Sequence, residues 1–149
     1  MSGAAVKVLL AEDDPDDRQL IREAFVENRL PNELHYVEDG EELMDYLHRR
    51  GRYQNSHDAP LPGLILLDLN MPRKDGREAL REIKADPDLR WIPTVVLTTS
   101  KAEADVLRSY DMGANSYMVK PDSFKSLMEL IRVFSQYWFQ HVRLPQDEW

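Results

Sequence analysis

The stretch Gly63-Leu64-Ile65-Leu66-Leu67-Asp68 places four aliphatic side chains in succession between a glycine and an aspartate. A strand with one face in water alternates apolar and polar residues, so this unbroken apolar run predicts a strand covered on both faces, as in a parallel sheet. Residues 6–11, 94–98 and, more weakly, 116–119 have the same character. Residues 33–37 alternate polar and apolar side chains, which is typical of an edge strand.

Segments whose apolar residues recur at helical spacing separate these strands. The first helix start is marked by Asp14 as N-cap, by Pro15 at the first helical position, and by Asp16 and Asp17 near the positive end of the helix dipole. Three later starts have the spacing of a capping box: Asp39 with Glu42, Asp75 with Glu78, and Ser100 with Glu103. Strands that alternate five times with helices predict a doubly wound α/β domain.

Length and composition indicate one domain. The chain has 149 residues, of which 42% are hydrophobic, so a substantial core is expected. We expect a single domain over residues 1–149, with its core at about 5–140 and a C-terminal tail at 141–149. Residues 49–63 contain two glycines and two prolines, which predicts a long surface loop.

Charge and residue usage exclude several classes of function. Asp plus Glu number 27 against 19 Lys plus Arg, and the net charge of -8 disfavours binding to nucleic acid through a basic face. There is no cysteine, which excludes disulfide scaffolds, thiol nucleophiles and cysteine-ligated zinc. The apolar runs are too short to span a bilayer, and no secretory signal is visible at the N-terminus. We therefore expect a cytoplasmic protein.

Residues with carboxylate, amide, hydroxyl or ammonium groups stand at the ends of four of the predicted strands. Ligands of an open parallel sheet bind beyond the carboxyl ends of its strands, so these residues are expected to converge there. They are Glu12 and Asp13 after the first strand, Asp68 and Asn70 after the third, Thr98 at the end of the fourth, and Lys120 after the fifth.

This set suits phosphoryl transfer. Clustered carboxylates are stable together around a hard cation with oxygen ligands, of which Mg²⁺ is the usual one. A carboxylate such as Asp68 can attack phosphorus to form an acyl phosphate. The negative oxygens of the transferred group would be stabilised by the metal, by the ammonium of Lys120 and by the hydroxyl of Thr98 or Thr99.

These motifs and their spacing resemble the receiver domains of two-component response regulators over nearly the whole chain. Asp68 and Thr98 are 30 positions apart (98 − 68), and Thr98 and Lys120 are 22 apart (120 − 98), as in that family. The resemblance also rests on the acidic pair after the first strand, on Asn70 and on the Lys120-Pro121 pair. It implies a flavodoxin-like fold with strand order 2-1-3-4-5 and five flanking helices.

The resemblance assigns a role to each matching residue. It implies that Asp68 is phosphorylated, that Thr98 and Lys120 bind the phosphoryl group, and that Tyr117 is an aromatic switch. It further implies that Mg²⁺ is bound by Glu12, Asp13, Asp68 and the backbone carbonyl of Asn70, and that the Lys120–Pro121 bond is cis. Many receivers have Asp where this chain has Glu12, and the longer side chain could reach the metal directly or through water.

Within the family, the chain is most similar to the single-domain regulators paired with bacterial and cyanobacterial phytochromes. Several features indicate this: the Glu12-Asp13-Asp14 form of the acidic motif, the loop at residues 49–63, Leu69-Asn70-Met71-Pro72 with Asp75-Gly76-Arg77, Thr98-Thr99-Ser100, and the ending Tyr137-Trp138-Phe139 with Leu144-Pro145. The resemblance implies a sensor histidine kinase, of phytochrome type, as the phosphoryl donor.

The last predicted helix is apolar on more than one face. One face, which would pack on the sheet, consists of Phe124, Leu127, Met128, Ile131, Phe134 and Trp138. A second line consists of Leu130, Val133, Tyr137 and His141, and it is more apolar than a solvent-facing helix needs. We interpret the second line and the tail at 141–149 as the interface of a homodimer.

The sequence therefore predicts a stand-alone phospho-acceptor switch, a signalling protein that promotes only its own phosphorylation and dephosphorylation. One alternative is an interaction module that keeps the fold and works without phosphorylation. Another is a phosphatase of the haloacid dehalogenase type, which needs a second Asp two residues after the nucleophile. Asn70 occupies that position and cannot act as a general acid, which disfavours the phosphatase.

Overall fold

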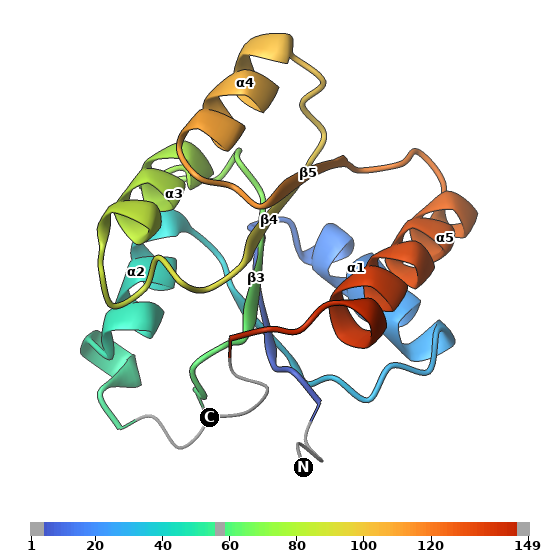
Figure 1. Ribbon diagram of the computed structural model, residues 1–149, viewed down its shortest axis with the longest axis horizontal. Helices are drawn as coiled ribbons and strands as arrows, with labels where there is room; N and C mark the ends of the chain where they lie inside the picture. Colours follow the sequence, from blue (N-terminus) through green and yellow to red (C-terminus); the bar gives the residue numbers. More distant parts are fainter. Residues whose placement is uncertain (1–4, 56–58, 146–149) are drawn as a thin grey trace.

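The computed structural model describes residues 5–55 and 59–145, and its centre is a five-stranded parallel sheet (Figure 1). The strands are β1 (Val8–Ala11), β2 (Leu34–Val37), β3 (Leu64–Leu67), β4 (Thr94–Thr98) and β5 (Ser116–Val119). Their order is β2-β1-β3-β4-β5, and all neighbouring pairs are parallel. The predicted doubly wound fold and its strand order are confirmed.

Helices cover both faces of this sheet (Figure 1). One face carries α1 (Pro15–Glu27) and α5 (Phe124–Ser135), and the other carries α2 (Gly40–His48), α3 (Gly76–Ala85) and α4 (Glu103–Asp111). No helix in the described ranges is long and apolar enough to cross a bilayer.

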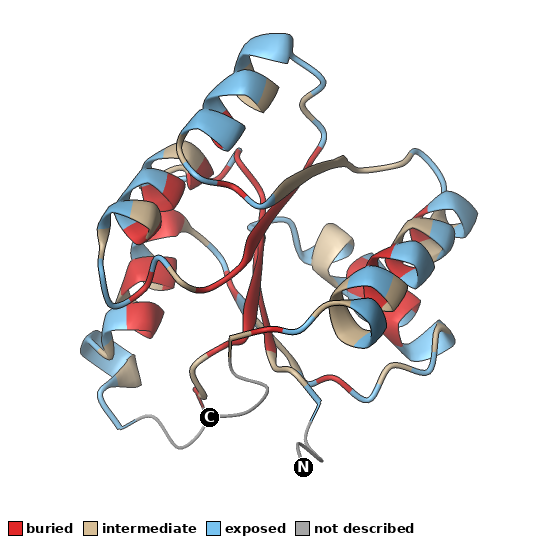
Figure 2. Cartoon of the chain, viewed as in Figure 1, coloured by how far each residue is buried: buried red, intermediate tan, exposed pale blue. Residues whose placement is uncertain are grey.

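The strand that decided the fold shows how the two layers form. Along β3, Leu64 and Leu66 belong to the core beneath α1 and α5, whereas Ile65 and Leu67 belong to the core beneath α2 and α3. All four side chains are fully buried, because successive strand residues point to opposite faces and both faces are covered (Figure 2). Each such side chain contributes about 1.5–3 kcal/mol by leaving water.

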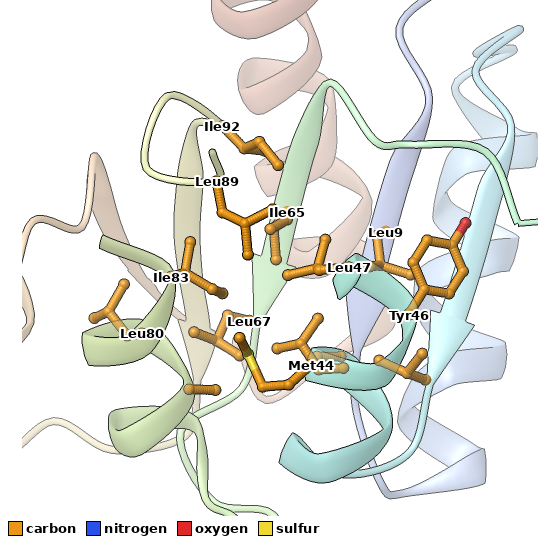
Figure 3. Packing of buried hydrophobic residues seen from close by; sticks show 14 of the residues in the cluster. Leu9, Met44, Tyr46, Leu47, Ile65, Leu67, Leu80, Ile83, Leu89 and Ile92 are labelled. Atoms are coloured by element: carbon orange, nitrogen blue, oxygen red, sulfur yellow. The ribbon is translucent and has the colours of Figure 1, made fainter. Parts of the chain in front are cut away.

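The core beneath α2 and α3 interlocks helix and strand side chains (Figure 3). Met44 and Leu47 of α2 and Ile83 of α3 pack against Leu9 and Ile65 of the sheet. The helix residues recur at helical spacing, which is the pattern that placed these segments as amphipathic helices. This packed core supports the loops at the carboxyl edge of the sheet.

Three of the four predicted helix starts are confirmed. The side chains of Asp14, Asp39 and Asp75 accept hydrogen bonds from backbone N–H groups of α1, α2 and α3. The fourth prediction is wrong, because Ala102 is the N-cap of α4 and makes no side-chain cap. The hydroxyl of Ser100 donates to the Asp105 carboxylate at 2.6 Å and accepts from the backbone N–H of Ala102 at 3.3 Å, so it holds the segment before the helix rather than the first turn.

The loop predicted at residues 49–63 is only in part a surface loop. A short 3-10 helix spans Gly51–Tyr53, and residues 56–58 lie outside the described ranges. The later part packs down, since Ala59 is buried and the Tyr46 hydroxyl donates to the carbonyl of Pro60 at 2.8 Å. The sequence prediction did not take into account Tyr46 of α2, whose hydrogen bond holds residues 59 and 60 against the helix.

The last helix has the two faces that the sequence indicates. Leu127, Ile131 and Phe134 are buried, and the chain continues beyond α5 as a π-helical segment, Gln136–His141. In the second line, Val133 is 49% and Tyr137 is 54% exposed. The proposed dimer stays a prediction, and residues 146–149 of its tail lie outside the described residues.

Candidate functional site

The carboxyl ends of β1 and β3 bring the acidic residues together. These strands pair with Ala11 opposite Leu67, so Glu12 and Asp68, the next residue of each strand, lie side by side. One carboxylate oxygen from each of Glu12, Asp13 and Asp68 lies within 4.8 Å of the others. The structure therefore produces the convergence that the sequence predicts.

Lys120 is the cation of this cluster. Its Nζ donates to the carboxylate of Glu12, to Asp17 at 2.8 Å and to Asp68 at 3.4 Å. The backbone N–H of Lys120 donates to the carbonyl of Thr98 at 2.8 Å, which ties the end of β5 to the end of β4. One ammonium thus faces three carboxylates in a site that is largely closed to water.

Burial and charge shift the pKa values in opposite senses for the acid and the base. Burial raises the pKa of Glu12 to about 7, with a further increase from the Asp68 charge and an opposing effect of Lys120. Burial alone would lower the pKa of Lys120, but its hydrogen bonds to Asp17 and Glu12, together with the charges of Glu12 and Asp68, outweigh burial and raise that pKa above its usual value. Lys120 therefore stays charged. The carboxylates around it outnumber it three to one, so one ammonium cannot neutralise them.

This donor set fits a hard divalent cation. Three carboxylate oxygens within reach of a common point are the ligands that Mg²⁺ and Mn²⁺ prefer, and a single ammonium leaves net negative charge. Asn70 follows in the same loop, and its backbone N–H donates to Asp68 Oδ1 at 3.3 Å. The residues proposed as metal ligands from sequence are therefore gathered at one site.

The predicted switch residues lie on β4 and β5, and Tyr117 packs against the core beneath α2 and α3. Thr98 is fully buried at the end of β4, and its hydroxyl has no hydrogen-bond partner among the described residues. The hydroxyl of Tyr117, on β5, donates to the backbone carbonyl of Ser100 at 3.0 Å. A buried hydroxyl without a partner is unfavourable and is available to a new acceptor.

Backbone anchors position the acidic loops. Arg18 Nη1 donates to the carbonyl of Glu12 at 2.9 Å and to that of Asp13 at 3.1 Å, and the guanidinium lies over the Tyr36 ring. At the other loop, a Cβ on Gly76 would lie 2.1 Å from the Asp68 carbonyl oxygen, so only glycine lets α3 begin this close to Asp68.

One expectation from the family resemblance is wrong for this structure. The Lys120–Pro121 peptide bond is trans, since the described chain contains no cis peptide bond. The trans isomer of an X–Pro bond is intrinsically preferred by about 0.5–1 kcal/mol. Lys120 reaches the acidic cluster all the same, because its backbone is paired to β4.

Sequence reasoning missed two contributors to the site. Asp17 was interpreted only as a favourable helix start, although it lies one helical turn beyond Asp13 and contacts Lys120. Arg77 belongs to a motif of the subfamily resemblance, but the sequence assigns it no role in the site, whereas the structure shows that it joins Asn70 to α4 through a bidentate contact with Asp105. The one-turn spacing could have found Asp17, but no local signal identifies Arg77, because its partner is 28 residues away.

Comparisons with known proteins agree with this geometry. A model of the response regulator receiver domain family matches residues 8–132. Response regulator Rcp1 of Synechocystis sp. is 44% identical over 138 residues, which are 93% of this chain and 92% of that protein.

Solved structures match over nearly the full chain. The phosphorylated cyanobacterial phytochrome response regulator RcpA superimposes with a TM-score of 0.88 and 44% identity, covering 95% of this chain and 99% of that one. The Mn²⁺-bound form of Rcp1 gives a TM-score of 0.86 and 42% identity, with coverage of 94% and 99%. Response regulator RPA3017, in red light signalling of R. palustris, gives 0.88 and 36%, with coverage of 94% and 98%.

Proposed function

This chain belongs to the response regulator receiver domain family, and we propose that it accepts a phosphoryl group on Asp68. Its similarity is to single-domain response regulators of phytochrome signalling, and the relatives that it matches are of nearly its own length. It is accordingly a signalling protein, in which phosphorylation changes the conformation of the domain.

The observation that carries this proposal is the position of Asp68. Its side chain is 8% exposed, within reach of the Lys120 ammonium and beside the carboxylates of Glu12 and Asp13. A buried carboxylate that is surrounded by further acids and one lysine serves no evident purpose in stability, because burying charged groups is costly. It is suited to accept a group that arrives with negative charge and a metal ion.

The chemistry follows from these contacts. One Oδ of Asp68 attacks the phosphorus atom of a phosphohistidine, forming an O–P bond as the P–N bond breaks, and the electron pair returns to the imidazole. Lys120 compensates the charge of the phosphoryl oxygens, and Thr98 donates its free hydroxyl to one of them. Water is kept from the acyl phosphate by the burial of Asp68 and Glu12.

A divalent cation completes the site. Glu12, Asp13, Asp68 and the backbone carbonyl of Asn70 are the groups that would hold Mg²⁺. The bound metal supplies compensation for the charge that develops on the phosphoryl oxygens. The Mn²⁺-bound form of Rcp1 supports a divalent metal in this family.

The donor that we propose is a sensor histidine kinase of phytochrome type, which is supported by the similarity to RcpA. We further propose that Thr98 and Tyr117 transmit phosphorylation to the surface of α4, β5 and α5. The interface that we propose for a homodimer is the line of Leu130, Val133, Tyr137 and His141, in which Leu130 is partly buried against the core and the other three are exposed. Sedimentation at micromolar concentration, with and without a phosphoryl mimic, tests the dimer.

The test of the proposed function is the intact mass of the protein after incubation with acetyl phosphate. We expect one phosphoryl adduct in wild type with Mg²⁺ and none with excess chelator or in Asp68→Asn. Asp16→Asn is the matched control, since Asp16 is an exposed neighbouring aspartate that makes no contact with the cluster in the described structure. Equal labelling of folded Asp68→Asn and wild type would contradict the proposal.

The alternative, an interaction module that works without phosphorylation, predicts a different result. A folded wild-type protein that takes up no phosphoryl group under any condition would favour that alternative. The buried charges of Glu12, Asp68 and Lys120 argue against it, because burying charged groups is costly and a module without phosphoryl chemistry has no use for them.

A further inference from the structure

The loop after β3 presents Asn70 between two buried residues. Leu69 is fully buried and Met71 is 7% exposed, whereas Asn70 is exposed to solvent. Packing therefore holds the loop on either side of Asn70, and the orientation of Asn70 itself depends on polar contacts. This orientation matters, because the backbone carbonyl of Asn70 is one of the groups that would hold the divalent cation.

Hydrogen bonds hold both ends of the peptide unit that joins Leu69 to Asn70. The Asn70 N–H donates to Asp68 Oδ1 at 3.3 Å, and the Leu69 carbonyl accepts the N–H of Gly76 at 2.9 Å. Arg77 Nη1 adds a contact of 3.5 Å to the same carbonyl and one of 3.3 Å to Asn70 Oδ1. Arg77 therefore contacts both the backbone and the side chain of this segment.

The guanidinium of Arg77 is held in turn by Asp105 of α4. Contacts of 3.3–3.5 Å are long for hydrogen bonds, so their effect depends on how firmly the donor is held. Arg77 Nε and Nη2 each donate to one oxygen of Asp105, and both distances are 2.9 Å. The two side chains are only 29% and 18% exposed, so this bidentate pair is better shielded from water than an ordinary surface pair. Asp105 thus keeps the guanidinium beside the loop.

The charge of Arg77 opposes the binding of a cation. Hydrogen bonds from Arg77, followed by that of Ser100, lower the pKa of Asp105 to about 2, so the pair is ionised at neutral pH. A guanidinium near a metal site repels a divalent cation, and removal of that positive charge alone should tighten its binding. Loss of the contacts to the loop should weaken the binding instead. Charge and positioning therefore predict opposite effects for the removal of Arg77.

We propose that Arg77 is a positioning residue for the metal site: held by Asp105, it fixes the Leu69–Asn70 segment and with it the carbonyl that holds the cation. The proposal rests on the function proposed for Asp68, because it concerns the cation that phosphoryl transfer to Asp68 needs. A ligand group that is already ordered binds a metal more tightly, since less conformational freedom is lost on binding. The residue that holds Arg77 lies in α4, so the metal site is coupled to that helix.

The test measures the Mg²⁺ affinity of the unphosphorylated protein by titration calorimetry. Binding is expected to weaken about ten-fold in Arg77→Gln, although a positive charge is lost. Arg81→Gln is the matched control, because Arg81 is an exposed arginine one turn further along α3 that makes none of these contacts, and it should bind no more weakly than wild type. Asp105→Asn should also weaken binding, and the double variant should match Arg77→Gln, because Asp105 acts through Arg77. Arg77→Lys should not restore the affinity, because an ammonium cannot make the bidentate contact.

Two further measurements separate positioning from general damage to the site. In chelator, the backbone amides of Asn70 and Gly76 should exchange with solvent faster in Arg77→Gln and Asp105→Asn than in wild type, because the loop is less firmly held. At saturating Mg²⁺, by contrast, beryllofluoride, a phosphoryl mimic, should bind Arg77→Gln as tightly as wild type, because the cation is then in place in both proteins.

Other results would overturn the proposal. A Mg²⁺ affinity of Arg77→Gln equal to that of wild type, or tighter, would show that Arg77 acts through its charge alone. Losses that add in the double variant would show that Asp105 does not act through Arg77. Weaker beryllofluoride binding at saturating Mg²⁺ would show that the whole site is damaged. If wild type binds neither Mg²⁺ nor beryllofluoride, the function proposed for Asp68 fails and this proposal fails with it, whereas wild-type binding that Arg77→Gln leaves unchanged overturns only the role of Arg77.

Discussion

Two lysines of similar burial lie at opposite ends of this sheet and behave differently. At the carboxyl end, Lys120 faces three carboxylates, and its pKa is raised above the usual value. At the amino end of β4, Lys84 donates to the carbonyls of Arg90 and Ile92 and to the Asn115 side chain, at 2.9–3.3 Å. Burial lowers the pKa of Lys84 to about 8, because these acceptors carry no charge.

The difference shows that partners, rather than burial, decide what a buried lysine does. Lys120 stays charged and is the counter-charge of an acidic site, which is what phosphoryl chemistry needs. Lys84 is a structural clamp that joins the end of α3 to the loops before β4 and β5. Substitutions at each end of the sheet should therefore give different readouts.

The largest effect on stability is expected for Lys120→Met. Removal of the ammonium leaves Glu12 and Asp68 buried without a counter-charge, and breaking a buried pair in this way costs about 3 kcal/mol. Urea unfolding in chelator measures the change, and labelling by acetyl phosphate should also fall strongly. A variant as stable as wild type would show that the carboxylates relax apart.

The next effect is expected at the clamp itself, for Gly113→Ala. Gly113 has a φ of 109°, and a Cβ there would lie 3.0 Å from Cγ of Lys84. Backbone strain and displacement of the lysine together should cost about 2 kcal/mol in unfolding free energy. Phosphoryl labelling should not change, which separates this end of the sheet from the other. A loss of labelling at unchanged stability would contradict that separation.

The pH dependence of stability distinguishes the two lysines further. The pKa of Lys84 is about 8 in the folded protein and 10.5 as a free side chain. Between these values the unfolded chain binds a proton that the folded protein does not, so the free energy of unfolding rises with pH, by about 1 kcal/mol from pH 8 to 10. The slope fades as the pH falls below the folded pKa, because Lys84 is then protonated in both states.

Urea unfolding of wild type and Lys84→Met at a series of pH values measures this contribution. The difference between the two curves isolates Lys84, because the other titrating groups are common to both proteins. Parallel curves between pH 8 and 10 would show that Lys84 has an ordinary pKa.

The smallest effect is expected for Asp17→Asn. This half-buried carboxylate competes with Asp68 for the Lys120 ammonium, and such pairs contribute about 0.2–1 kcal/mol. Its removal should tighten beryllofluoride binding about three-fold. Asp16→Asn is the control for the loss of charge alone. Equal tightening in both variants would mean that Asp17 acts only through its charge at a distance.

Much of the fold could be predicted because its signals are local. The apolar runs placed all five strands to within two residues, and Asp14, Asp39 and Asp75 marked three helix starts. The fourth start was wrong, because the helix begins two residues later than a cap at Ser100 requires and the Ser100 hydroxyl donates to the Asp105 carboxylate. The trans Lys120–Pro121 bond likewise differs from the expectation that the family resemblance carried.

The sequence by itself determined which residues stand at the carboxyl ends of the strands, and so which groups the site contains. A strand that is apolar on both faces must lie inside a parallel sheet, and such a sheet gathers its strand ends at one edge. Only the tertiary structure decided how these groups are connected. Asp17 competes for Lys120, Arg77 reaches Asp105, and burial among neutral acceptors lowers the pKa of Lys84. Each of these depends on distances between segments far apart in the chain.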